Sequence, residues 1–359
     1  MRKIRVIEVV SGLGLGGAEK GLISRLENLP QNFNSIVFNV WADLDKLSLP
    51  NHIVHKIISR KRKRLPISLA FNLVKSNSDF VVVRAPVDLI IVGYLKKLIP
   101  WVAWRLVFEV HSQIITTRGP ILAKVMKFFL TKIANEVALT IAVSKSVARG
   151  DLASTQINIH VAYLGSNVEI DLSKIQSPKL PRFVFIGRLV DLKRPLWLID
   201  RVLSIATKMP LYPGFLSIIG DGNLREILEL RIRNSTIENF VTYYGEQNDI
   251  REFLYRSTHL ISCSLTEGLP ITFFEAKLAG LRIVCTPFGA GEVLDNDDFQ
   301  SNSFAEDEFE RALLTILSMP TDSLSRKLDL IQRNEKYNAK ICSEKYYRLL
   351  EKELSAKKI

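Results

Sequence analysis

The sequence contains few of the residues from which disulfide frameworks and metal centres are built. Its 359 residues include 3 cysteines and 5 histidines. An odd number of cysteines without metal-ligand spacing indicates buried or free thiols in a reducing compartment. We therefore expect neither a disulfide framework nor a cysteine metal site at Cys263, Cys285 and Cys342.

Long apolar runs free of charge are also absent. The most apolar stretches, residues 80–108 and 121–143, are each interrupted by several charged side chains. A membrane-spanning helix needs about 20 consecutive, predominantly apolar residues, so neither stretch is predicted to span a bilayer. The opening segment MRKIRVIEVV carries Glu8 within a very short apolar run, so no secretory signal is expected there. These patterns favour a cytoplasmic protein.

Acidic residues are scarce in the first half of the chain. The net charge is +12, and residues 1–170 hold 23 Lys and Arg against 11 Asp and Glu, whereas the remaining residues hold 26 of each. The excess includes the run RKRKR at residues 60–64. Such a field attracts nucleic acid, anionic lipid or an anionic substrate. No aromatic platform or helix-turn-helix pattern accompanies the charge, so nucleic acid is the least favoured partner.

Apolar runs rich in Val, Ile and Phe alternate with longer amphipathic segments along the whole chain. Nearly continuous apolar runs are typical of parallel strands that are covered by helices on both faces. The expected strands are KIRVIEVV, SIVFNVW, FVVVRAP, RLVFEVH, LTIAVS and HVAYL in the first half, and RFVFIG, FLSIIGDG, FVTYYG, HLISCS and RIVCTP in the second. The expected helices are residues 18–29, 121–136, 195–207, 224–233, 250–255, 272–279 and 307–317.

Proline and serine interrupt this alternation at SKIQSPKLP, residues 173–181, which we interpret as a linker. Two βα series on either side of a break predict two Rossmann-like, doubly wound α/β domains that face each other across a cleft. The predicted domains are residues 1–172 and 182–340. A charged helix is predicted over residues 341–359. One hypothesis is that this helix packs back on the N-terminal domain.

The stretch SGLGLGGAEKG, residues 11–21, contains Gly12, Gly14 and Gly17 in the spacing G-x-G-x-x-G. Glycines between a strand and a helix let backbone amides approach an anion, and the helix start adds partial positive charge. A dinucleotide site also requires an acid about 20 residues further on. Asp43 and Asp45 lie somewhat late for that role, so another phosphate ligand is the alternative.

Cations follow a predicted strand in FIGRLVDLKRP, where Arg188 and Lys193 stand after Gly187. A diphosphate leaving group gains charge on its bridging oxygen as it departs. Two fixed cations at a strand end would stabilise that charge more in the transition state than in the ground state. A pair of ordinary surface cations is the alternative for this segment taken alone.

The most specific pattern is SCSLTEGLPITFFEAKLAG. Glu267 precedes a predicted helix whose first turn suits Pro270, and Glu275 lies about one and a half turns into it. Carboxylates accept paired hydrogen bonds, which matches the vicinal hydroxyls of a sugar and of a ribose. The apolar neighbours favour a buried, organised segment over a capping acid with a solvent-facing glutamate.

Together, GGAE, EVH, FIGRL with its lysine, IGDG and EGLP with FFEA resemble the family-four retaining glycosyltransferases of GT-B fold. The resemblance runs from Gly16 to about Glu292. It implies transfer of a hexose or N-acetylhexosamine from a nucleoside-diphosphate sugar to a hydroxyl acceptor, with retention, without metal and without a further cofactor. It also implies a glycan or lipid-linked acceptor in cell-surface polysaccharide, lipopolysaccharide or capsule synthesis. The positive charge of the first half fits peripheral contact with an anionic membrane. The apolar, lysine-punctuated segment Ile121–Ile133 is a candidate for that interface, and an ordinary packed helix is the alternative. A nucleotide-sugar epimerase of the same architecture is the rival enzyme.

The resemblance assigns roles to residues of this chain. His111, Arg188, Lys193 and Glu267 would be catalytic. The residues implied to bind the donor are Gly16, Gly17, Gly220, Gly222, Gly268, Leu269, Pro270 and Glu275. Two departures from the family pattern stand out: YLGSNVEI replaces an Asn-Gly-Val-Asp type stretch, and Arg194 follows Lys193 where a glycine is usual. Either cation could bind the phosphate, and spacing favours Lys193.

Overall fold

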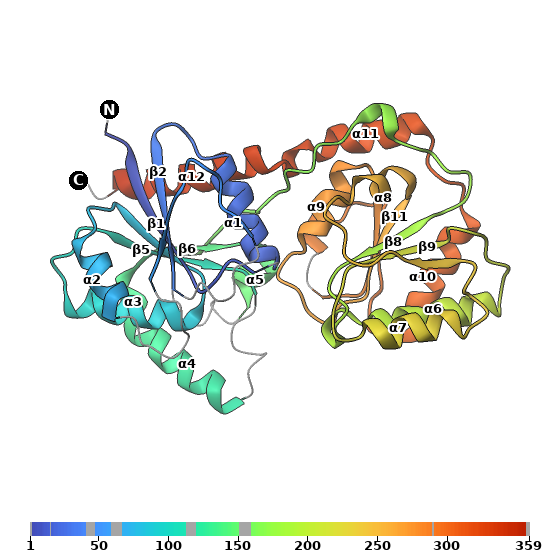
Figure 1. Cartoon of the computed structure of the whole chain (residues 1–359), viewed down its shortest axis with the longest axis horizontal. Coiled ribbons are helices and arrows are strands. Elements are labelled where there is room, and N and C mark those ends of the chain that lie inside the picture. Colours follow the sequence, from blue (N-terminus) through green and yellow to red (C-terminus); the bar gives the residue numbers. More distant parts are fainter. Residues whose placement is uncertain are drawn as a thin grey trace. The chain divides into compact units, whose positions relative to one another are not determined.

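The computed structural model describes residues 2–14, 16–40, 47–58, 67–112, 120–150, 159–288 and 291–356. The chain forms two compact units. Unit 1 comprises residues 1–167 and 339–359, and unit 2 comprises residues 168–338. Each unit is built around its own sheet, with helices packed against it (Figure 1). The segment interpreted as a linker, residues 173–181, lies within unit 2.

The sheet of unit 1 has seven strands in the order β3-β2-β1-β4-β5-β6-β7, and every pair is parallel. Its strands are β1 (Ile4–Val10), β2 (Phe33–Asn39), β3 (Val54–Ile57), β4 (Phe80–Val83), β5 (Arg105–Val110), β6 (Val137–Ala142) and β7 (Ile159–Val161). Its helices are α1 (Gly17–Glu27), α2 (Ile67–Lys75), α3 (Pro86–Leu98), α4 (Pro120–Ile133), α5 (Lys145–Arg149) and α12 (Ala339–Ala356).

The strands of unit 1 are buried because helices cover them. All four residues of β4 are fully buried, as expected of a central parallel strand. The last helix, α12, contributes Tyr346, Tyr347 and Leu350 to the core formed by β1, β4, β5 and β6. These large apolar surfaces hold the C-terminal segment on unit 1.

The sheet of unit 2 has six parallel strands in the order β10-β9-β8-β11-β12-β13. They are β8 (Phe183–Ile186), β9 (Leu216–Ile219), β10 (Val241–Tyr243), β11 (His259–Ser262), β12 (Arg282–Cys285) and β13 (Phe299–Gln300). The helices are α6 (Pro195–Ala206), α7 (Arg225–Arg233), α8 (Arg251–Arg256), α9 (Ile271–Leu278), α10 (Glu306–Ser318) and α11 (Leu324–Asn334). No helix in the described ranges is both long and apolar enough to cross a membrane.

The structure confirms the eleven predicted strands and the parallel α/β class. It adds elements that the sequence pattern did not indicate: β3, β13, α2, α3, α5 and α11. The strand β3 is exposed along its whole length, and β13 has only two residues, so neither has a strong apolar signal. One local detail was wrong: α9 begins at Ile271, so Pro270 is its N-cap residue and not part of its first turn. All three cysteines are buried and free.

Candidate functional site

The order in which the chain adds strands reverses at β8, in the middle of the unit 2 sheet. From β8 the chain proceeds to β9 and β10 on one side and then crosses to β11 on the other. Ligands of open α/β sheets bind at such switch points, beyond the carboxyl ends of the strands. The loops that leave β8 and β11 carry the two motifs FIGRLVDLK and SLTEGLP. The topology therefore brings both predicted donor-binding motifs to one edge of one sheet.

At this edge Lys193 forms an ion pair with Glu267. The lysine ends a short 3-10 helix, Asp191–Lys193, and the glutamate lies in the loop before α9. Ser264 Oγ donates a hydrogen bond of 2.8 Å to Glu267 Oε1, the same oxygen that receives the lysine. The side chains of Lys193 and Glu267 are 18% and 15% exposed, so a ligand can reach both. Ser264 was missed by the sequence reasoning, although it stands three residues before Glu267.

The sequence left open whether Lys193 or Arg194 binds the phosphate. In the structure these two side chains have different surroundings. Arg194 has a left-handed backbone (φ 54°). Its guanidinium lies 4.0 Å from the centre of the Trp197 ring, and burial lowers its pKa. Only Lys193 reaches Glu267, so this lysine is the better candidate for a phosphate ligand. Arg188, at the end of β8, is exposed.

The glycines of IGDG allow two loops to approach each other closely. A Cβ on Gly220 would stand 1.9 Å from the Gly187 carbonyl oxygen, and one on Gly222 would stand 2.3 Å from that of Leu189. The amide of Leu189 donates to the carbonyl of Asp221 at 2.9 Å. Gly220 and Gly222 thus shape the edge by packing the loop after β9 against the loop after β8.

Buried groups on both sides fix the position of α9. Phe273 and Phe274 are fully buried. Lys277, which is 2% exposed, forms ion pairs with Asp295 and Asp298. Gly268, Leu269 and Pro270 are buried in the turn that leads into the helix, whereas Glu275 is half-buried on its first turns. These buried contacts hold α9 in place, with its N-terminus near the carboxyl ends of the strands, where its first backbone amides can bind an anion.

In unit 1 the glycine motif forms the turn between β1 and α1. Gly16 is the N-cap of α1, and Gly17 is its exposed first residue. A Cβ on Gly16 would stand 2.4 Å from Glu19 Oε2, so the Glu19 carboxylate lies over the start of the helix. An anion at this position is stabilised by the helix dipole. Just before the motif, Ser11 Oγ donates to buried Asp88 at 2.8 Å.

His111 follows β5, with Nε2 2.9 Å from Glu109 Oε1. Glu109 belongs to a buried ion cluster with Glu8, Arg25 and Arg84, in which Arg25 is 2.8 Å and Arg84 is 3.0 Å from Glu109 Oε2. Burial alone would raise the pKa of Glu109, but the two guanidiniums, with the contact from His111, hold it well below its usual value. The ionised carboxylate of Glu109 thus lies within ion-pair distance of the imidazole of His111, although His111 Nε2 and Glu109 Oε1 are not aligned for a hydrogen bond.

The C-terminal helix completes the buried ion cluster. Tyr346 Oη donates to Glu109 Oε2 at 3.2 Å. The Arg25 guanidinium carbon lies 3.9 Å from the centre of the Tyr346 ring, which is a cation–π contact. Residues 338 positions apart in the sequence thus share one cluster, from Glu8 to Tyr346.

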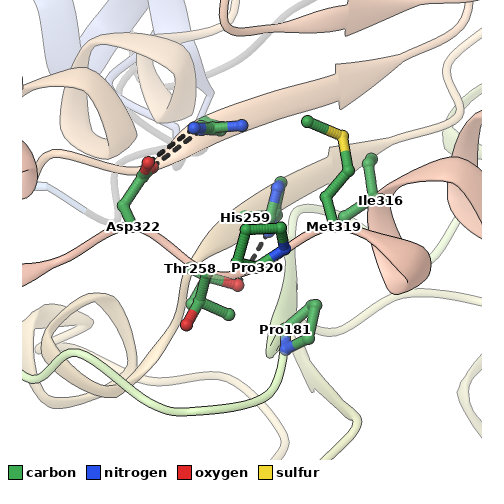
Figure 2. Close-up of a pocket in the computed structure, with 9 residues that line it drawn as sticks. Pro181, Thr258, His259, Ile316, Met319, Pro320 and Asp322 are labelled. Carbon is green, nitrogen blue, oxygen red and sulfur yellow. Dashed lines mark hydrogen bonds and ion pairs between the residues drawn. The ribbon is translucent and has the colours of Figure 1, made fainter.

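A small pocket in unit 2 lies among His259, Thr258 and Pro320 (Figure 2). It has room for about one water, with a volume of about 10 Å³. Burial, together with the nearby cations Arg282 and Lys327, lowers the pKa of His259 to about 3. The neutral His259 side chain is therefore part of the packed core of unit 2. The pocket beside it is too small to accommodate a nucleotide.

Some predicted features fall elsewhere. Asp43, Asp45 and the RKRKR run lie outside the described residues, as do residues 289–290 of TPFGAGEVL. Within the described ranges, no three His, Cys, Asp or Glu side chains gather closely enough to hold a metal ion.

Comparison with known proteins agrees with the motifs. Residues 180–319 match the family model of "Glycosyl transferases group 1". An uncharacterized glycosyltransferase of Methanocaldococcus jannaschii is 34% identical over 109 residues, which are 30% of this chain and 26% of that protein. The Vi polysaccharide biosynthesis protein VipC/TviE of Salmonella typhi is 31% identical over 72 residues, 20% of this chain and 12% of that protein. The aligned parts thus span about a quarter or less of these relatives.

The crystal structure of Anabaena Alr3699/HepE in complex with UDP covers nearly the whole chain. It has a TM-score of 0.76 and 16% identity, and the match covers 98% of this chain and 100% of that one. Likeness at this identity is a likeness of fold. The chain therefore has the GT-B fold, and its residues 180–319 match the family model of the group 1 glycosyl transferases.

Proposed function

We propose that this protein is a glycosyltransferase that moves a hexose or N-acetylhexosamine from a nucleoside-diphosphate sugar to a hydroxyl acceptor. The observation that carries the proposal is the pairing of Lys193 with Glu267 at the β8/β11 switch point. A cation for phosphate and an acid for sugar hydroxyls stand side by side there, within the part of the chain that matches the family.

Each group has a distinct task in the proposed reaction. Lys193 and exposed Arg188 would neutralise the charge that grows on the diphosphate as the glycosidic bond breaks. Glu267 would accept hydrogen bonds from the transferred sugar, and Glu275 from the ribose. The amides of Gly268, Leu269 and the start of α9 would bind phosphate oxygens. When no donor is bound, Glu267 holds the lysine ammonium in place.

Unit 1 would supply the remaining groups. The turn at Gly16 and Gly17 would let backbone amides approach the diphosphate, which would replace the Glu19 carboxylate over the start of α1. His111 would lie beside the transferred sugar, with the carboxylate of Glu109 within ion-pair distance of its imidazole. The proposed transfer retains the anomeric configuration, with the leaving phosphate accepting the proton of the acceptor.

UDP-sugars are the first donors to test, since Anabaena HepE was crystallised with UDP and with UDP-glucose. The relative named as a Vi polysaccharide biosynthesis protein supports a role in polysaccharide synthesis. The acceptor that we propose for such a role is a glycan or a lipid-linked oligosaccharide. The catalytic cations are all protein groups in this proposal, so activity should persist after treatment with EDTA.

The decisive experiment screens nucleotide sugars for thermal stabilisation and then follows the stabilising donor with and without candidate acceptors by mass spectrometry. Ligand at one hundred times its dissociation constant should stabilise the chain by about 2.7 kcal/mol. Lys193→Ala should weaken this effect, whereas Lys179→Ala, an exposed lysine before β8, should not. Absence of stabilisation by every nucleotide sugar would contradict the proposal, and sugar interconversion from donor alone would identify an epimerase.

A further inference from the structure

One oxygen of the Glu267 carboxylate receives two hydrogen-bond donors. Lys193 Nζ and Ser264 Oγ both contact Oε1, the serine at 2.8 Å. A carboxylate in an ion pair has no proton to give, so the Ser264 hydroxyl is the donor. Among the residues that the structure describes, none donates to Oε2. One oxygen of Glu267 is thus occupied by protein groups, and the other can accept hydrogen bonds from a ligand.

Ser264 lies in a segment that is fixed from both sides. Its carbonyl accepts a hydrogen bond of 2.7 Å from Oγ1 of Thr286, which follows β12, and both residues are fully buried. On the other side, the Leu265 amide donates at 2.9 Å to the carbonyl of Leu192, which precedes Lys193 in the short 3-10 helix. Because β11 lies between β8 and β12 in the sheet, segments from both neighbouring strands hold the residues that follow β11.

The two groups on Oε1 differ in their freedom to move. A lysine ammonium ends a flexible four-carbon chain, whereas a serine hydroxyl lies close to its own backbone. Lys193 is 18% exposed, and a diphosphate carries more negative charge than one carboxylate, so the ammonium can turn to a bound diphosphate. Ser264 is shut off from solvent and donates to Glu267 alone. When the lysine turns to phosphate, the serine is the group that remains on Oε1.

We propose that Ser264 is a positioning residue, whose hydroxyl holds the Glu267 carboxylate toward the transferred sugar while Lys193 binds the diphosphate. This role rests on the proposed function, because a nucleotide sugar must lie between these groups. Ser264 is fully buried, so it acts through Glu267 and contacts neither the sugar nor the phosphate. A carboxylate that is fixed at one oxygen presents the other at a set position, which reduces the entropy lost when the sugar binds.

The test compares two affinities of the full chain, one for a nucleotide sugar and one for the bare nucleoside diphosphate. Isothermal titration calorimetry uses UDP-glucose with UDP, followed by the corresponding ADP and GDP pairs. Ser264→Ala should weaken binding of the nucleotide sugar roughly ten- to a hundredfold, as expected for one hydrogen bond to a charged group, and should leave the nucleoside diphosphate within about twofold. Ser264→Cys keeps a similar volume with only a weak S–H donor, so the same selective loss is expected.

Ser204→Ala is the matched control. Ser204 Oγ donates at 2.9 Å to Glu310 Oε2, and Lys208 contacts the same oxygen, so the same three residue types meet near the end of α6. This variant should leave both affinities unchanged, and melting curves establish that each variant is folded. Unchanged binding of the nucleotide sugar in Ser264→Ala would overturn the proposal, as would an equal loss for both ligands. If the unaltered chain binds none of the pairs, the proposed function fails, which is a separate result.

Discussion

Replacing Glu109 by Gln tests whether the buried ion cluster holds unit 1 together. In the intact chain two carboxylates, Glu8 and Glu109, balance two guanidiniums, Arg25 and Arg84, at separations of 2.7–3.4 Å. The side chains of these four residues are at most 10% exposed. The substitution leaves a net positive charge that water cannot reach.

The expected cost follows from that geometry. Removing one partner of a buried ion pair typically destabilises a fold by about 3–5 kcal/mol, because the remaining charge is uncompensated. Glu109 contacts both arginines, so the upper part of this range is expected. The matched control is Glu344→Gln on α12, which breaks an exposed pair with Arg348 at 3.8 Å and should cost no more than about 0.5 kcal/mol.

Hydrogen exchange measured by mass spectrometry is the suitable assay, because a two-unit chain need not unfold in one step. Protection of β4, β5 and α12 should fall in Glu109→Gln, and that of unit 2 should not. Adding Arg84→Met to Glu109→Gln restores the charge balance and should recover part of the loss. A loss below about 1 kcal/mol, or no recovery in the double variant, would refute the view that charge balance stabilises this cluster.

Three further outcomes are expected. Lys193→Ala should lower turnover with an identified donor roughly a hundred- to a thousandfold while leaving the melting temperature within a few degrees of the unaltered chain; rates within threefold would rule out its role at the leaving group. Burial raises the pKa of Asp88 to about 6, against a hydrogen bond from Ser11 that lowers it. The folded chain therefore binds more protons than the unfolded chain between about pH 4 and 6, so Asp88 lowers the free energy of unfolding by about 3 kcal/mol as pH rises through this window. Asp88→Asn should remove that decline in urea titrations from pH 4 to 7, and an unchanged slope would contradict the assignment. Gly220→Ala should cost at least about 2 kcal/mol, because φ is +136° and the new Cβ would overlap the Gly187 carbonyl; calorimetry that shows no change in melting would disprove the close packing of these loops.

The sequence by itself was sufficient for the class of fold and for the candidate motifs. Continuous apolar runs such as Phe80–Val83 carry a strong signal because parallel strands are buried on both faces. The loop residues Lys193 and Glu267 could be selected as partners because their motifs follow strands, and the carboxyl ends of parallel strands share one edge. Weak elements were missed for the converse reason: β3 is exposed, so nothing in its composition demands burial.

Contacts between distant segments were decided only by the tertiary structure. The sequence contains no pattern that pairs Glu8 with Arg84 or places Tyr346 beside Arg25, because ion pairs inside a core depend on which strands become neighbours and which helix covers them. Tertiary packing also separated Lys193 from Arg194: a left-handed turn directs one to Glu267 and stacks the other on Trp197. Likewise, the sequence predicts a helix over residues 121–136, but only packing shows that Leu130 and Ile133 are buried whereas Phe128 is exposed.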